Sequence, residues 1–199
     1  MAFRGVDIPP YFRVLPPSVD PQTHGALGGM THLRIVSGAG FGVGTHETTQ
    51  LCLLALGQWL RSGFAPKRVL DFRSGSGILS VAAALSGARV EAVEIDAAAI
   101  ENGRENARVN EVEPLIDFRT TLSQTVEPFE LVLANILAGV LIEYAKPLCA
   151  RVSAGGRLVL SGLVGTDVPG VLATYKPLLG SMRAEVYSRG DWRAITFVS

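Results

Sequence analysis

The sequence has little cysteine, no excess of either charge and no long apolar run. Cys52 and Cys149 are the only cysteines among 199 residues, so we expect two free thiols rather than a disulfide framework. Basic and acidic residues number 18 each, which argues against nucleic acid as the principal partner. No run is long enough to span a membrane, and the N-terminus lacks a signal pattern. We therefore expect a globular cytoplasmic protein.

Composition and length suit one compact α/β domain with a short extra segment. Hydrophobic residues make up 48% of the chain and charged residues 18%. Residues 1–30 are rich in proline and glycine, and we expect an extended arm there with little regular structure beyond one short strand. The folded domain is expected to span residues 31–199. It would begin with a short strand at 32–36 and a glycine-rich loop, followed by a helix capped by Thr45.

From residue 67 onward, short apolar runs alternate with helix-like segments. Strands are expected at 68–71, 89–95, 115–119, 130–134 and 157–161. Helices are expected at 77–86, 97–110, 140–151 and 168–178. Such alternation predicts a parallel sheet with helices on both faces. Two further strand-like runs, 183–189 and 192–198, are joined by a Gly-Asp turn signal and predict a terminal antiparallel hairpin.

The first of these strands runs into a glycine turn with the sequence D-F-R-S-G-S-G, which starts at Asp71. Gly75 and Gly77 would let the backbone approach a ligand, and Glu94 at the next strand end can accept bonds from both hydroxyls of a ribose. This order is typical of a site for an adenosine-containing cofactor, and Asp71, Arg73, Gly75, Gly77 and Glu94 are its expected binding residues. The R-x-G-x-G spacing from Arg73 fits the methyltransferase loop D-x-G-x-G-x-G better than the G-x-G-x-x-G of dehydrogenases. A dinucleotide oxidoreductase is therefore the third-ranked hypothesis.

Several polar and aromatic residues are interpreted as structural. Asn102, Asn106 and Asn110 repeat every four residues along one expected helix and are interpreted as a solvated face. Trp192 is assigned to packing in the core or at the edge of the sheet. His46 is interpreted as a structural residue near a helix start, because no clustered partners indicate a metal site.

Four stretches together resemble one known family. They resemble the motifs F-G-T-G-x-H-x-T-T at 41–49, D-x-G-C-G-S-G-I-L at 71–79, A-N-I-L at 134–137 and G-G-x-L-x-x-S-G at 155–162. These motifs are those of the PrmA family, which methylates lysine side chains and the amino terminus of a large-subunit ribosomal protein. The related lysine methyltransferase of the electron-transfer flavoprotein shares part of the pattern.

The resemblance implies a Rossmann-like class I methyltransferase fold with S-adenosylmethionine as cofactor. That fold has a mostly parallel seven-stranded sheet with a C-terminal antiparallel hairpin and helices on both faces. Carried over by position, the family's cofactor contacts fall on Thr49, Arg73, Glu94 and Asn135. Thr49 would reach the methionine end, Glu94 the ribose and Asn135 the methyl group. Asn135 would also orient the acceptor, an amine of a protein substrate for which a ribosomal protein is one candidate.

Two departures from the family bear on function. Arg73 stands where the family has glycine, and its side chain would turn out to solvent, pair with Glu94 or bind the carboxylate of the cofactor. A pseudoenzyme or cofactor-binding module inactivated by Arg73 is therefore the alternative hypothesis. The family also carries an N-terminal recognition domain, which we expect to be absent because only residues 1–30 precede the motifs.

Overall fold

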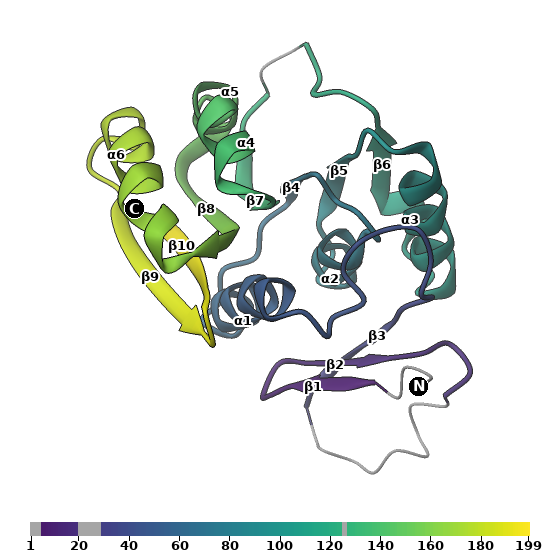
Figure 1. Ribbon diagram of the computed structural model, residues 1–199. Coiled ribbons are helices and arrows are strands. Elements are labelled where there is room, and N and C mark those ends of the chain that lie inside the picture. The colour runs from purple at the N-terminus through teal and green to yellow at the C-terminus, as the bar shows by residue number, and fades with distance from the viewer. Residues whose placement is uncertain (1–4, 20–28, 125–126) are drawn as a thin grey trace.

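The computed structural model describes residues 5–19, 29–124 and 127–199 and contains two sheets (Figure 1). The larger sheet has seven strands in the order β6-β5-β4-β7-β8-β10-β9. Its strands are β4 (Arg68–Phe72), β5 (Arg89–Val93), β6 (Ile116–Arg119), β7 (Phe129–Asn135), β8 (Val152–Val164), β9 (Arg183–Arg189) and β10 (Trp192–Val198). The helices are α1 (Glu47–Arg61), α2 (Ile78–Leu85), α3 (Ala97–Val109), α4 (Ala138–Glu143), α5 (Ala145–Cys149) and α6 (Val168–Leu179).

Strand pairing confirms the predicted fold class. The pairs β4·β5, β5·β6, β4·β7 and β7·β8 are parallel. Strand β10 is antiparallel to both β8 and β9, so the chain ends in the expected hairpin. After β6 the chain returns to the other side of β4 to form β7, which is where the strand order reverses. Ligand sites of open α/β sheets lie at such a reversal, beyond the carboxyl ends of the strands.

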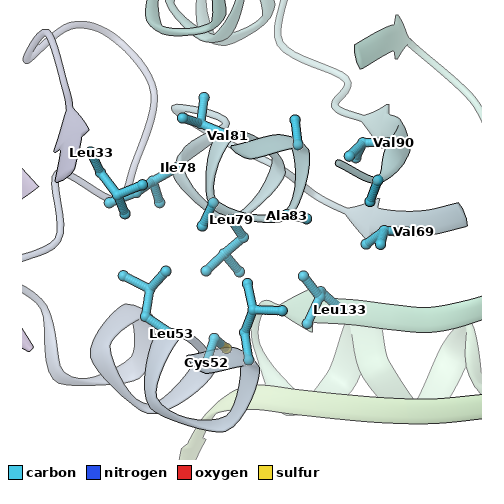
Figure 2. Close-up of a cluster of buried hydrophobic side chains, with 14 of the residues drawn as sticks. Leu33, Cys52, Leu53, Val69, Ile78, Leu79, Val81, Ala83, Val90 and Leu133 are labelled. Carbon is cyan, nitrogen blue, oxygen red and sulfur yellow. The ribbon is translucent and has the colours of Figure 1, made fainter. Parts of the chain in front are cut away.

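Alternating side chains along the central strands build a core on each face of the sheet. Val69 of β4 and Leu133 of β7 pack with α1 and α2, as Figure 2 shows. Leu70, the next residue of β4, packs instead with α4, α5 and α6. Successive strand residues point to opposite faces, so a continuous apolar run is what a sheet covered on both sides requires. None of the described helices is both long and apolar enough to cross a membrane.

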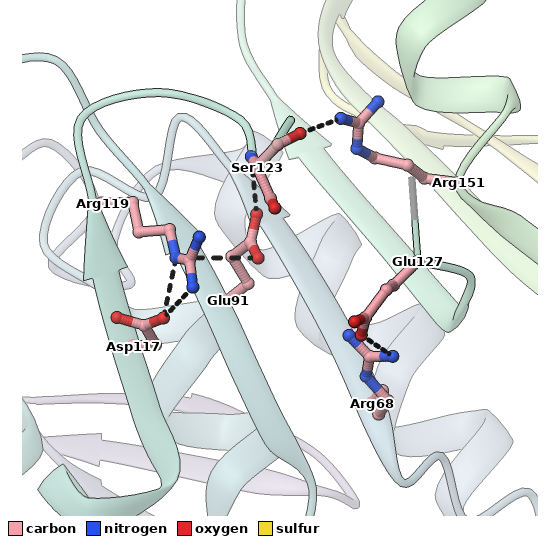
Figure 3. Close-up of polar contacts among 7 residues, drawn as sticks. All are labelled: Arg68, Glu91, Asp117, Arg119, Ser123, Glu127 and Arg151. Atoms are coloured by element: carbon pink, nitrogen blue, oxygen red, sulfur yellow. Dashed lines mark hydrogen bonds and ion pairs between the residues drawn. The ribbon is translucent and has the colours of Figure 1, made fainter. Parts of the chain in front are cut away.

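No helix follows β6 among the described residues of the β6–β7 connection, and polar contacts hold that segment instead (Figure 3). Arg119 pairs with Asp117 at 2.7 Å and with Glu91 at 3.8 Å. The carboxylate of Glu91 accepts the backbone N–H of Ser123, whose carbonyl oxygen accepts a bond from the Arg151 guanidinium at 2.6 Å. Partly exposed pairs of this kind contribute little stability individually, so their main effect is to fix the path of the chain.

The expectation of little regular structure in the arm is wrong for its described residues. Strands β1 (Val6–Ile8) and β2 (Phe12–Leu15) pair antiparallel, and β2 pairs parallel with β3 (Thr31–Arg34). Ile8, Phe12 and Val14 are buried in the cluster that includes α1 and α2, so burial of these side chains outweighs the proline-rich composition. Residues 1–4 and 20–28 lie outside the described part of the chain, and the domain boundary after residue 30 stays a prediction.

Two predicted elements differ most from their expected bounds. The helix expected at 140–151 is two helices, α4 and α5, which meet at Tyr144. Pro147 lies in the first turn of α5 and has no N–H to continue the hydrogen-bond ladder of α4, which explains the break. Strand β8 is longer than the expected 157–161 at both ends, because Val152 pairs with Phe129 of β7 and the far half pairs with β10 up to Val164.

Candidate active site

A pocket of about 420 Å³ opens beyond the carboxyl ends of β4, β5 and β7. The glycine loop after β4 and the loop that precedes α1 both contribute to its wall. Four predicted site residues line it, namely Arg73, Gly75, Glu94 and Asn135. The remaining wall is mostly apolar and aromatic, formed by Ala39, Phe41, His46, Thr48, Asp96, Ala99, Ile136, Leu137, Gly162 and Trp192. The structure therefore brings together at one place residues that are far apart in the sequence.

The glycine loop has the backbone conformation that its sequence predicts. Gly75 and Gly77 have φ angles of 55° and 73°. A Cβ atom on Gly75 would lie 2.6 Å from the carbonyl oxygen of Phe41, so the loop is packed directly against the segment before α1. Gly77 precedes the first residue of α2 and serves as its N-cap. Neither position could take a side chain without strain in the backbone.

Glu94 braces this loop from the end of β5. Its side chain is buried, and one carboxylate oxygen accepts the N–H of Gly75 at 3.0 Å. The other oxygen accepts the N–H of Ile95 at 2.7 Å and that of Asp96 at 3.2 Å. A carboxylate offers about four acceptor positions, so these three bonds leave capacity for a hydroxyl donor from the pocket. The contact of Glu94 with a ribose stays a prediction, and its role in shaping the loop was not anticipated.

Arg73 adopts a left-handed conformation with a φ of 64°, which a non-glycine residue rarely does. Arg73 lines the pocket, and its guanidinium carbon lies 5.7 Å from the centre of the Phe72 ring. Within the described part of the chain, no ion pair includes Arg73. The carboxylate of Glu94 is instead occupied by backbone N–H groups. Three positions were expected for the Arg73 side chain, and the one in which it pairs with Glu94 is therefore not observed.

Asn135 and Thr49 meet at the end of β7. The Asn135 side-chain amide donates to Thr49 Oγ1 at 3.4 Å, which leaves the amide oxygen without a partner among the described residues. Ser161 Oγ donates to the carbonyl of Thr48 at 3.1 Å and so fixes the start of α1 against β8. A Cβ on Gly162 would lie 2.6 Å from the carbonyl oxygen of Ile136, so the S-G motif supports the A-N-I-L motif. The two motifs thus position one polar side chain at the pocket.

Asp71 lies beneath the pocket rather than in its wall. It is buried and accepts a hydrogen bond from Ser80 Oγ at 2.6 Å. Burial raises the pKa of its carboxyl to about 6, although the Ser80 bond acts in the opposite direction. Together with Thr49, Asp71 borders a recess of only about 20 Å³, too small for a cofactor. Contact between Asp71 and a cofactor stays a prediction. The contact that is observed, the hydrogen bond from Ser80, links β4 to α2.

The substitution Asp71→Asn is expected to stabilise the fold at pH 8 and to have little effect below pH 4. The folded-state pKa of Asp71 lies above the ordinary value of 3.8, so the wild-type protein loses stability as pH rises through about 6. An asparagine side chain does not ionise and escapes this loss. The gain above pH 6 should be roughly 2–3 kcal/mol for a shift of about two units. Urea denaturation at pH 4 and pH 8 measures it, and equal effects at both pH values would contradict the assignment.

Three aromatic rings form one side of the pocket, and the sequence did not indicate this grouping. The His46 ring lies 5.2 Å from that of Phe41 and 4.8 Å from that of Trp192, both edge to face. His46 also caps α1 by accepting the Thr48 N–H at Nδ1, so the expectation of Thr45 as cap is wrong. The assignment of Trp192 to core or edge packing is incomplete, because Trp192 also lines the pocket.

The interpretation of the asparagine stripe on α3 as a solvated face is wrong. Asn102, Asn106 and Asn110 are all buried and hydrogen-bonded to backbone atoms of other segments. A four-residue repeat of polar side chains fits an exposed face and a buried hydrogen-bonded face equally well, so spacing alone could not separate them.

The fold and the site identify the class of protein. Class I methyltransferases have a seven-stranded sheet in this strand order, in which β10 is the antiparallel strand and a glycine loop follows β4. The chain belongs to the family described as ribosomal protein L11 methyltransferase (PrmA), whose model matches residues 17–199.

Individual relatives agree with this assignment. The chain is 38% identical over 185 residues to a ribosomal protein L11 methyltransferase of Geotalea daltonii, covering 88% of this chain and 59% of the relative. It is 42% identical over 147 residues to the protein of that name from Thiobacillus denitrificans, covering 73% and 48%. The chain thus spans about half the length of the curated relatives it matches.

Solved structures extend the likeness to three dimensions. A crystal structure of a ribosomal protein L11 methylase from Lactobacillus delbrueckii subsp. bulgaricus has a TM-score of 0.82 at 26% identity and covers 98% of each chain. The O-methyltransferase TomG from Streptomyces achromogenes, solved in complex with SAM, has a TM-score of 0.59 at 18% identity and covers 78% of this chain and 82% of its own. The second likeness shows the fold alone.

Proposed function

We propose that this protein is an S-adenosylmethionine-dependent N-methyltransferase that modifies an amine of a protein substrate. The observation that carries the proposal is the pocket itself. It combines a glycine loop open to a ligand, the acidic strand end Glu94 and the amide of Asn135 at the carboxyl edge of the sheet. Membership in the L11 methyltransferase family supports the same reaction.

The residues of the pocket fit the proposed cofactor. Gly75 lines the pocket, and Glu94 retains acceptor capacity for a ribose hydroxyl. Asn135 lines the pocket and is hydrogen-bonded to Thr49, which does not line it, and we place the methionine portion of the cofactor beside this pair. Arg73 has no acidic partner among the described residues and supplies a cation for the cofactor carboxylate. The sulfonium, when bound, supplies the methyl group.

Methyl transfer to nitrogen needs a neutral amine aligned with the methyl carbon. The unpartnered oxygen of Asn135 can accept an N–H of the acceptor and direct its lone pair toward the methyl group. Phe41, His46, Leu137 and Trp192 form the part of the pocket wall without carboxylates, whereas Glu94 and Asp96 line it where β5 ends. An ammonium that packs against the aromatic and apolar part loses hydration, which lowers the pKa of the amine and favours its neutral form. The proton then leaves to solvent.

We propose a lysine side chain or an amino terminus as acceptor, with ribosomal protein L11 as the first candidate because the relatives carry that name. A ribosomal substrate agrees with the cytoplasmic location expected from the sequence, which stays a prediction. The alternative of an inactive cofactor-binding module gains no support from the comparisons, since the matched relatives are named as methyltransferases.

Two measurements, made one after the other, test the proposed function. Calorimetry with S-adenosylhomocysteine is expected to show binding to one site. Incubation with S-adenosylmethionine carrying a tritiated methyl group should then label L11 at nitrogen, located by mass spectrometry. Absence of binding at millimolar ligand would overturn the proposed cofactor. Binding without transfer to L11 or to amine-bearing peptides would favour the inactive module.

A further inference from the structure

The buried asparagines of α3 hold the chain that connects β3 to α1. In Figure 1 this connection rises beside α3 and then turns back toward α1. Asn110 binds the end of β3, where its amide oxygen accepts the N–H of Arg34 at 2.9 Å and its amide nitrogen donates to the Arg34 carbonyl at 2.6 Å. Asn102, two turns earlier on α3, accepts the N–H of Gly40 at 3.3 Å and donates to the carbonyl of Val36 at 3.2 Å.

Asn106 differs from its two neighbours because it joins two separate segments. Its oxygen accepts the N–H of Val36 at 2.7 Å, in the connection to α1. Its nitrogen donates to the carbonyl of Ser76 at 2.9 Å, in the glycine loop after β4. The side chain is fully buried, so both bonds are shielded from water.

The two bridged segments also touch each other next to this bond. The N–H of Ser76 donates to the Phe41 carbonyl at 2.9 Å, and Ser76 Oγ donates to the carbonyl of Gly42. A Cβ on Gly40 would lie 2.5 Å from the Ser76 nitrogen, and one on Gly38 would lie 2.5 Å from the Asn102 amide. The glycines therefore allow the connection to lie flat against both α3 and the glycine loop.

Without such contacts, the loss of backbone entropy disfavours an ordered connection between β3 and α1. Residues 36–46 form no helix or strand and include glycines 38, 40, 42 and 44. Each ordered residue loses backbone entropy, and glycine loses more than any other residue. If the loop is disordered in part of the population, the apparent affinity for a ligand falls by that fraction.

We propose that Asn106 is a positioning residue for cofactor binding, which joins the loop at 36–44 to the glycine loop so that both walls of the pocket are in place before the ligand arrives. This inference rests on the proposed function. Asn106 does not line the pocket and acts through Ser76 and Val36. Asn110 makes the same kind of bonds from the same helix face but reaches only the end of β3 and its own helix.

The test compares N106L with N110L, two identical changes at buried positions, one within α3 and one at its C-cap. Calorimetry with S-adenosylhomocysteine is expected to show a dissociation constant raised about tenfold or more in N106L, because two buried backbone groups lose their partners. In N110L it should stay within about twofold of wild type while the protein is destabilised. At saturating cofactor, kcat of N106L should remain near wild type, which separates positioning from chemistry.

Hydrogen exchange supplies a second readout. The amides of Gly40 and Ser76 should exchange faster in N106L than in N110L. If N106L does not fold, N102A removes the bonds to Gly40 and Val36 and should raise the dissociation constant about threefold or more. Wild-type affinity in folded N106L, or in N102A, would overturn the inference. Lack of binding by the wild-type protein would instead overturn the proposed function, so the two failures are distinguishable.

Discussion

Replacing Arg73 with glutamine is expected to weaken binding of S-adenosylhomocysteine about tenfold to a hundredfold. Arg73 lines the pocket, and no ion pair among the described residues includes it, so a ligand carboxylate is the group that would neutralise its charge. A hydrogen bond to a charged group contributes about 1.5–3 kcal/mol, which corresponds to this range. Calorimetry measures the effect directly.

The matched control compares S-adenosylmethionine with its decarboxylated form, which lacks only the carboxylate. Decarboxylated S-adenosylmethionine should bind wild type and R73Q with nearly equal affinity, whereas R73K should retain part of the affinity for the intact cofactor. Tighter binding by R73Q to both ligands would show that the arginine obstructs the pocket instead. That result would favour the alternative in which Arg73 disables the site.

The variant R73G separates backbone strain from side-chain chemistry. Arg73 has a φ of 64°, and relieving such a conformation is worth about 1 kcal/mol or more. Glycine also gives the unfolded chain more freedom, which costs about 0.4–1 kcal/mol. The two effects nearly offset, so we expect a small change in thermal stability. A change in cofactor affinity in R73G therefore reports the missing guanidinium.

Features set by short sequence windows could be predicted. The strands of the large sheet follow from apolar runs, and the loop after β4 follows from its glycines at positions that need positive φ. The placement of Arg73, Glu94 and Asn135 around one pocket follows from the rule that parallel strands end at one edge. These predictions depend on local periodicity and on a general topology, and both are visible in one sequence.

Features set by contacts between distant segments could not be predicted. Asn106 is buried because Val36 and Ser76 present backbone groups to it, and neither is near it in the sequence. Strands β1 and β2 form because the helices α1 and α2 offer an apolar surface that the proline-rich composition did not reveal. Trp192 reaches the pocket only because the C-terminal hairpin returns beside β8 and brings it against His46.

Replacing Asn135 with alanine should lower kcat about a hundredfold to a thousandfold, by analogy with the loss of one positioned polar group at a reacting centre. The amide nitrogen of Asn135 is held by Thr49 Oγ1, which turns the amide oxygen toward the acceptor. Without that oxygen the amine can still enter the pocket, but its lone pair is no longer aligned with the methyl carbon. Steady-state rates with saturating cofactor and an amine-bearing protein substrate measure this loss.

Two conservative variants distinguish alignment from packing. N135D keeps an acceptor oxygen and should retain more activity than N135A, while T49V removes the hydroxyl that holds the amide and should lower kcat by a smaller factor, about tenfold. Affinity for S-adenosylhomocysteine should change less than kcat in all three, because the remaining wall of the pocket is intact. A kcat of N135A close to that of wild type would exclude Asn135 from the chemical step. The backbone carbonyls near Asn135 would then be the groups that align the amine.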